Sequence, residues 1–142
     1  MSGKVGYDAG LPRDDFMPEE KILTKNQIRA EIAYGCVNKK VHKNADKSQK
    51  EEEKKYLQLA RSFPALVHTC GLVQAVAFVT AKEKETGKDY LHHLETIMPL
   101  APETLAKMSR SADLLEYQRL TRDAMDSAAW LKRYAETLLK ES

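Results

Sequence analysis

The sequence predicts an all-α protein, a single-domain helical bundle of about five to six helices with the longest helix C-terminal. Two observations support this fold class. Residues 112–140 place their apolar side chains on one helical face, as a helix packed on a core requires. No segment of the chain finds a strand partner, and signals for helix starts recur along it. With 142 residues, the chain can bury one core without disulfides or a structural metal.

The N-terminal residues 1–21 are expected to form a flexible tail, because they mix Gly, Pro and charges without any period. Residues 22–142 then form the helical domain. A first helix starts with a capping box of Thr24 and Gln27, and Leu23 and Ile28 are placed as a hydrophobic staple. We expect this helix to run to about residue 42 and to bury one face, made of Ile28, Ile32 and Cys36.

A second helix is expected to begin near Gln49, because Ser48 and Glu51 have the spacing of another capping box. It carries an inward face made of Tyr56, Leu57, Ala60 and Phe63. Pro64 lacks an N–H group and disfavours helix in the residue before it, so the helix should end or bend at Phe63. Pro64 would then open a short helix of its own.

The apolar stretch after Gly71 is expected to be a third helix, residues 72–84, with Gly71 allowing a change of direction or a close helix contact. Its valines keep a strand alternative open, but the following sequence AKEKE favours a helix. Gly87 would provide the C-terminal stop. Residues 89–98 form a short amphipathic helix with Asp89 as a candidate cap.

The last two helices follow a turn that contains Pro99 and Pro102. A short helix is expected to open at Pro102 and Glu103. The final helix, roughly residues 112–140, buries one face, made of Leu114, Tyr117, Leu120, Ala124, Ala128, Leu131, Ala135 and Leu138.

The composition indicates a globular protein of the cytoplasm, with 42% hydrophobic and 31% charged residues and a net charge of +2. That charge is too small to indicate a nucleic-acid partner by itself, so the positions of the cations matter. Cys36 and Cys70 have no framework or zinc spacing, and two reduced thiols are expected over a disulfide. The start of the chain has no apolar signal region. Residues 63–79 are interrupted too often to cross a membrane.

No motif of catalysis is visible, so the chain is predicted not to be an enzyme and to need no cofactor or metal. His92 and His93 would point about 100° apart on a helix, so surface histidines are favoured over metal ligands. His68 near Cys70 leaves open a thiol nucleophile with its base. The apolar surroundings favour an inert core cysteine instead.

Basic residues cluster at the end of the first expected helix, at Lys39, Lys40, Lys43 and Lys47. A solvated helix end explains them, since cations are favoured there by the helix dipole. Contact with the phosphates of a nucleic acid is the alternative.

Trp130 lies opposite the core face of the last helix. It either packs against a second layer of the protein or anchors a partner surface, since Trp is enriched at interface hot spots. Stacking on a base is a third, weaker possibility.

Three motifs resemble a known family. They are LAR-x-x-P at residues 59–64, GL-x-x-A-x-A-F at residues 71–78, and the pair RLTR-x-A and WLKR-x-AE within residues 119–136. Together they resemble the small all-helical subunit of the type III-B CRISPR effector, the Cmr RNA-targeting complex. The resemblance covers residues 28–139 and leaves the N-terminal tail outside.

The resemblance implies a non-catalytic structural subunit that stacks along the complex and helps to hold the guide and target RNA in antiviral defence. Its implied partners are other subunits of the Cmr complex, neighbouring copies of itself, and the crRNA and target RNA. Candidates for RNA or subunit contact at matched positions are Arg61, Arg119, Arg122, Lys132 and Arg133. Some of these could instead form internal ion pairs with Asp123 or Glu136. The alternative function is a helical protein–protein adaptor that docks through Trp130 and never meets nucleic acid.

Overall fold

The structure, a computed structural model, describes residues 22–139, so the prediction for residues 1–21 lies outside the described residues. Within this part of the chain every regular element is a helix, and the all-α prediction is confirmed. The helices are α1 (Lys25–Asn38), α2 (Lys47–Cys70), α3 (Leu72–Lys82), α4 (Lys84–Ile97), α5 (Leu105–Ser111) and α6 (Leu114–Leu138). The C-terminal α6 is the longest, with 25 residues. The strand alternative for residues 72–84 is wrong.

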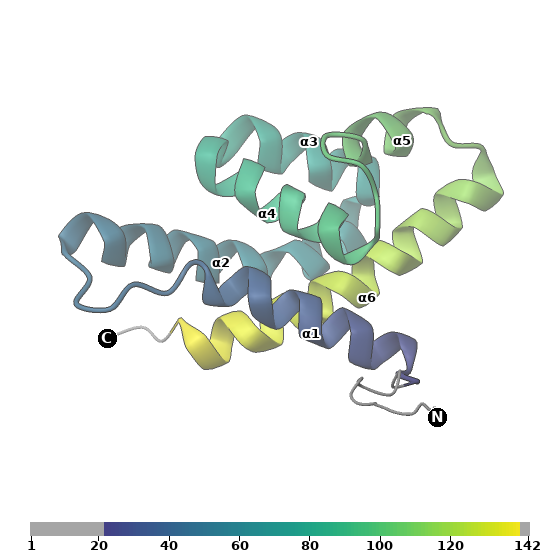
Figure 1. The fold of residues 1–142 in the computed structure, drawn as a ribbon. Coiled ribbons are helices and arrows are strands. Elements are labelled where there is room, and N and C mark those ends of the chain that lie inside the picture. Colours follow the sequence, from purple (N-terminus) through teal and green to yellow (C-terminus); the bar gives the residue numbers. More distant parts are fainter. Residues whose placement is uncertain (1–21, 140–142) are drawn as a thin grey trace, which may run out of the picture.

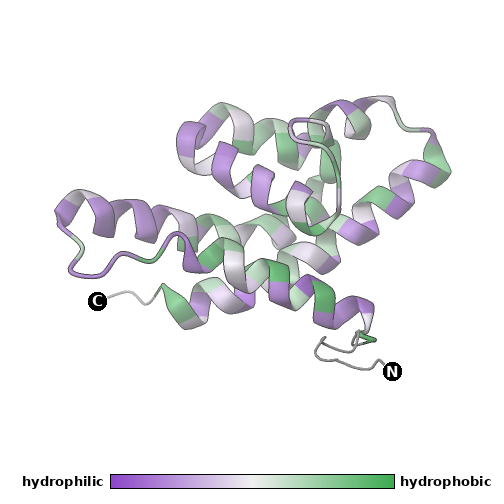
Figure 2. Cartoon of the chain, viewed as in Figure 1, coloured by the Kyte–Doolittle hydropathy of each residue, from purple (hydrophilic) through white to green (hydrophobic). Residues whose placement is uncertain are grey.

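The helices form two layers that share α2 (Figure 1). Helices α1 and α6 make one layer, and α3, α4 and α5 make the other. Helix α2 packs on α6 as well as on α3 and α4, so it joins the two layers. Its Tyr56 and Phe63 are fully buried and contact the ring of Tyr90 from α4. Hydrophobic and hydrophilic residues alternate along the helices of both layers (Figure 2).

Helix α1 begins as predicted, and of its predicted inward face Cys36 is buried, Ile32 is partly buried against the core and Ile28 is exposed. The Thr24 hydroxyl accepts from the Gln27 N–H at 3.1 Å, and the Gln27 side chain accepts from the Thr24 N–H at 2.7 Å. The helix ends at Asn38, four residues before the predicted end. Its buried residues are Arg29, Ala33, Cys36 and Val37. Ile28 is 46% exposed and Leu23 is 44% exposed, so the predicted staple is not buried.

Helix α2 corrects two predictions. Its N-cap is Asp46, not Ser48, and Asp46 makes the capping box with Gln49. The helix also runs through Pro64 to Cys70 without ending there. A proline inside a helix costs about 3 kcal/mol. Burial of Phe63 and Val67, on either side of it, offsets that cost by a comparable amount.

The predicted change of direction at Gly71 is confirmed. Its φ of +87° is a conformation that other residues rarely adopt. The hydroxyl of Tyr117 from α6 accepts a hydrogen bond from the Val73 N–H at 3.1 Å, so it caps the start of α3. A Cβ at Gly71 would lie 3.3 Å from the same hydroxyl. The corner between α2 and α3 is therefore held by α6.

Gly87 does not end a helix but lies buried inside α4. A Cβ at this position would lie 2.6 Å from the Val79 carbonyl oxygen of α3, closer than real atoms approach. Gly87 therefore lets α3 and α4 pack backbone to backbone. Asp89 also lies inside α4 and does not cap it.

Helix α5 starts at Leu105, later than predicted, and its start is capped from another helix. The buried carboxylate of Glu95 in α4 accepts from the N–H groups of Glu103 at 3.0 Å and Leu105 at 2.9 Å. Helix α6 is capped by Asp113. Its predicted core face is buried at Leu120, Ala124, Ala128, Leu131 and Ala135.

The ends of that face differ from the prediction. Leu114 is 73% exposed, while Tyr117 and Leu138 are half-buried. The first turn of α6 extends beyond the body of the molecule, where none of the other described helices covers it (Figure 1). The face was predicted from the helical period alone, which carries no information about the ends of the neighbouring helices.

Candidate functional site

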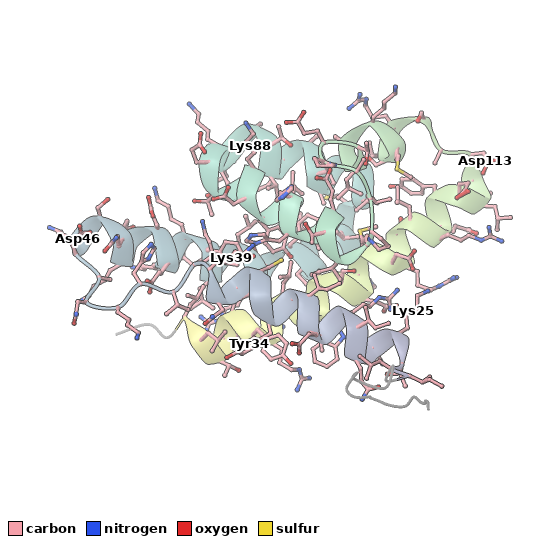
Figure 3. The ribbon with its side chains drawn as sticks, in the orientation of Figure 1. Lys25, Tyr34, Lys39, Asp46, Lys88 and Asp113 are labelled. Carbon is pink, nitrogen blue, oxygen red and sulfur yellow. The ribbon has the colours of Figure 1, made fainter. Side chains whose placement is uncertain are left out.

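The predicted lysine cluster lies at the end of α1 and in the loop to α2, and its members differ in surroundings. Lys39 and Lys43 are exposed, and Lys39 is labelled in Figure 3. Lys40 is half-buried, with its Nζ 2.7 Å from a carboxylate oxygen of Asp89 and 5.7 Å from the ring centre of Tyr56. Lys40 therefore bridges α1 to α4, while Lys39 and Lys43 face solvent.

A second group of predicted residues lies where α2 crosses α6. The Nε of Arg61 is 3.2 Å from a carboxylate oxygen of Glu136, and both side chains are about two-fifths exposed. Lys132 and Arg133 are exposed one turn earlier on α6. The structure thus brings Arg61 close to the second half of α6. Such an exposed ion pair contributes at most about 1 kcal/mol.

Arg119 and Arg122 form a third group, exposed on the first half of α6. Neither side chain belongs to the buried core face. The sequence left open an internal ion pair of one of the candidate cations with Asp123. In the structure Asp123 pairs with Arg29, a residue that the sequence analysis did not single out.

Arg29 is the buried cation that ties α1 to α6. Its guanidinium lies 3.3 Å from Asp123 and 3.3 Å from Asp126, and its side chain is only 11% exposed. The sequence could have indicated that Arg29 is buried, because it lies four residues before the buried Ala33 and both fall on one helical face.

Trp130 is half-buried and packs against an aromatic residue of the same chain. Its ring stacks on Tyr134 with centroids 5.8 Å apart, and Tyr134 meets Tyr34 of α1 edge to face at 5.4 Å. Tyr34, labelled in Figure 3, is 44% exposed. The aromatic cluster of Tyr34, Trp130 and Tyr134 therefore joins α1 to α6 and still leaves part of its surface uncovered.

His93 is buried, which corrects the prediction of a surface histidine. It is 9% exposed, and its Nδ1 lies 2.6 Å from the hydroxyl of Tyr56. Burial, followed by the nearby charge of Lys40, lowers the pKa of His93 to about 4. The imidazole is therefore neutral at pH 7, and we assign Nδ1 as the acceptor of the Tyr56 hydroxyl proton. Burial raises the pKa of Tyr56, which keeps that proton in place.

Neither thiol is hydrogen-bonded to a histidine in the part of the chain that the structure describes. Cys70 donates to the Leu66 carbonyl oxygen at 3.1 Å, and His68 is exposed. Burial raises the pKa of Cys36, which disfavours its reactive thiolate. Within residues 22–139, no three His, Cys, Asp or Glu side chains gather in a way that could hold a metal ion.

A hollow of about 810 Å³ lies between α4 and the start of α5. Its charged lining mixes Lys84, Lys88 and His92 with four carboxylates, of which Glu95 already caps α5. The mixture of signs gives no preference for an anion or a cation. The hollow therefore indicates no ligand class.

The comparisons with known proteins agree on one family. Residues 25–138 match the family described as CRISPR-associated protein (Cas_Cmr5). The CRISPR system Cmr subunit Cmr5 of Thermus thermophilus is 34% identical over 119 residues, which cover 83% of this chain and 98% of that protein. The X-ray crystal structure of a Cmr5 family protein from the same organism matches with a TM-score of 0.72 and 34% identity, covering 82% and 98% of the two chains. None of the helices described here is long and apolar enough to cross a membrane.

Proposed function

Since the chain belongs to the Cmr5 family of CRISPR-associated proteins, we propose that it is a non-catalytic structural subunit of a type III-B Cmr ribonucleoprotein. In this role it stacks along the complex and helps to hold guide and target RNA during antiviral defence. Its partners are other Cmr subunits and neighbouring copies of itself. Cleavage of RNA belongs to other subunits.

The observation that carries the proposal is the match to a Cmr subunit over almost the whole of that relative, 98% of its length. The arrangement of the described residues supports a binding role. Exposed cations lie along α6, in the layer of α1 and α6, and in the adjacent α1–α2 loop. Cations in such a series contact phosphates without reading bases.

The lysines of the α1–α2 loop are the sharpest test of RNA contact. Lys39 and Lys43 are exposed, whereas Lys40 pairs with Asp89 and supports the fold. We therefore exclude Lys40 from the RNA test and retain Lys39 and Lys43, with Arg119 and Arg122 as further candidates. Arg61 is a weaker candidate, because it is engaged with Glu136.

The first experiment purifies the tagged full chain from its native cells at moderate salt and extracts the bound nucleic acid. The proposal expects short RNAs of uniform length together with several co-purifying proteins. The complex with Lys39→Glu and Lys43→Glu should then bind target RNA about tenfold more weakly at low salt. Each lost phosphate contact should also reduce the slope of log affinity against log salt by about 0.7–0.9.

The matched control replaces Lys88 and Lys107, which are also exposed but lie on the layer of α3, α4 and α5. RNA affinity should be unchanged in the Lys88→Glu and Lys107→Glu complex. Equal losses in the two double variants would show a general charge effect and remove the loop from the proposal. A purified chain that carries one protein partner and no RNA would reject the proposal in favour of the adaptor function.

The adaptor alternative depends on Trp130. It predicts a protein complex that is insensitive to salt and is disrupted by Trp130→Ala. Since Trp130 already stacks on Tyr134, the matched control is Tyr134→Ala, which loosens the same contact without removing the indole. Loss of the partner with Trp130→Ala alone would favour the adaptor.

A further inference from the structure

Helix α3 is unusually apolar for a helix with one side open to solvent. Its sequence LVQAVAFVTAK contains a single charged residue, Lys82. Leu72, Ala75, Val76 and Val79 are buried, yet Ala77 and Ala81 are exposed and Phe78 is 47% exposed. The same side of the helix also carries the exposed polar residues Gln74 and Thr80, so the apolar residues form a strip on it. This exposed apolar strip of α3 has the composition of a contact surface.

This outer face borders a groove between α3 and α5. The groove has a volume of about 300 Å³, at the lower end of the range for ligand sites. Small or apolar side chains such as Val73, Ala77 and Ala106 line most of it. Among the described residues that line it, Arg110 is the one that carries a charge. The groove therefore suits a few apolar anchors flanked by negative charge.

A segment with this chemistry occurs in the same chain, outside the described residues. Residues 14–20, DDFMPEE, place Phe16 and Met17 between two pairs of carboxylates and contain no basic residue. The segment complements the apolar floor of the groove and the positive charge of Arg110.

Phe16 cannot readily reach the groove of its own molecule. It is six residues from Ile22, which allows a span of about 20 Å at full extension. The start of α1 and the α3–α5 pair lie on opposite sides of the first half of α6 (Figure 1). The same segment of a neighbouring copy in a stack would not have to pass around α6 to reach the groove.

We propose that the groove between α3 and α5 of one copy holds residues 14–20 of a neighbouring copy. The inference rests on the proposed stacking and names the contact that propagates it. The contact is heterologous, because the segment and the groove are different surfaces, so each copy offers one of each to its neighbours.

The test uses a fluorescent peptide of residues 11–22 and the full chain carrying Phe16→Ser and Met17→Ser, whose own segments no longer compete for the groove. Peptide binding is measured by fluorescence anisotropy. We expect saturable binding that is at least about tenfold weaker when Ala77→Glu is added, since the new carboxylate faces those of the peptide. The matched control is Ala65→Glu, on the exposed side of α2, which should leave binding unchanged.

Two further measurements keep the result interpretable. Arg110→Glu provides an independent groove variant if Ala77→Glu fails to fold, as judged by circular dichroism. Sedimentation should show that the unmodified chain self-associates more strongly than the Phe16→Ser and Met17→Ser variant. No saturable peptide binding, or equal weakening by Ala77→Glu and Ala65→Glu, would overturn the inference.

The peptide experiment contains no RNA and no other subunit. Its failure would therefore leave the proposed function in place, with stacking through another surface. Conversely, a native purification without RNA would reject the proposed function while leaving a positive peptide result intact.

Discussion

The buried pair of His93 and Tyr56 makes the stability of this protein depend on pH in a defined direction. The pKa of His93 is lowered to about 4 in the folded protein, against about 6.5 in an unfolded chain. Below pH 6.5 the unfolded state therefore binds more protons than the folded state. Stability is full above that pH and falls as the pH drops through this range, with the loss complete below about pH 4.

The size of the effect follows from the two pKa values. Between pH 8 and pH 5, this one group lowers the free energy of unfolding by about 2 kcal/mol. The limit at lower pH is about 3 kcal/mol. Protonation would also remove the acceptor at Nδ1 for the hydroxyl of Tyr56, 2.6 Å away, and place a charge near Lys40.

Urea unfolding at pH 8, 6 and 5 measures this prediction in the unmodified chain and in His93→Gln, whose side chain is neutral throughout. Other groups titrate in both proteins, so the difference between the two pH dependences reports His93. We expect the unmodified chain to lose about 2 kcal/mol more than His93→Gln. The control is His92→Gln, because His92 lies next to it on the outer side of α4 and makes no side-chain hydrogen bond to Tyr56. Parallel pH dependences in the unmodified chain and His93→Gln would refute the reasoning.

Two further predictions, one on close helix packing and one on a buried ion pair, can be tested by thermal or urea unfolding. Gly87→Ala should destabilise the protein by about 2–3 kcal/mol, because its Cβ would lie 2.6 Å from a carbonyl oxygen of α3. Gly35→Ala, in an open position on α1, should stabilise the protein by about 0.5–1 kcal/mol. If Gly87→Ala and Gly35→Ala changed the stability in the same direction, this explanation would be contradicted. Replacing Asp123 and Asp126 together by Asn should cost about 3 kcal/mol, since it leaves the charge of Arg29 buried without its carboxylates. Arg29→Met should cost less, because the two carboxylates are about half exposed and can be hydrated. A larger loss of stability in Arg29→Met than in the double Asn variant would show that the ion pair itself dominates.

The predictions that held depend on short stretches of sequence. The capping box at Thr24 and Gln27 satisfies N–H groups within three residues of each other, so it forms wherever the helix forms. Gly71 was recognisable as a turn because glycine adopts a positive φ without strain. The core face of α6 followed from a period of 3.6 residues maintained over many turns.

The predictions that failed depend on neighbours distant in the sequence. Pro64 was expected to end or bend a helix, but α2 does not end there, because burial of Phe63 and Val67 in the core outweighs the local cost of the proline. Gly87 was expected to stop a helix, yet it is required by the approach of α3. Neither neighbour can be located from the residues flanking the proline or the glycine.

The candidate site shows the same division. The lysines near the end of α1 were visible in the sequence as a cluster. Their separation into a structural Lys40, paired with Asp89 of α4, and the exposed Lys39 and Lys43 required the fold. The lowered pKa of His93 also arises only when α2 and α4 pack together, since desolvation depends on everything that surrounds the ring.

The sequence by itself therefore determined the helical class, the capped start of α1, the turn at Gly71 and, through its motifs, the family. These properties arise from hydrogen bonds and periodicities that act over a few residues. The tertiary structure alone decided which helices continue through a proline or glycine, which cations are left on the surface, and which side of α3 the other described helices leave exposed. Those properties depend on packing free energies between segments far apart in the chain, which no local pattern records.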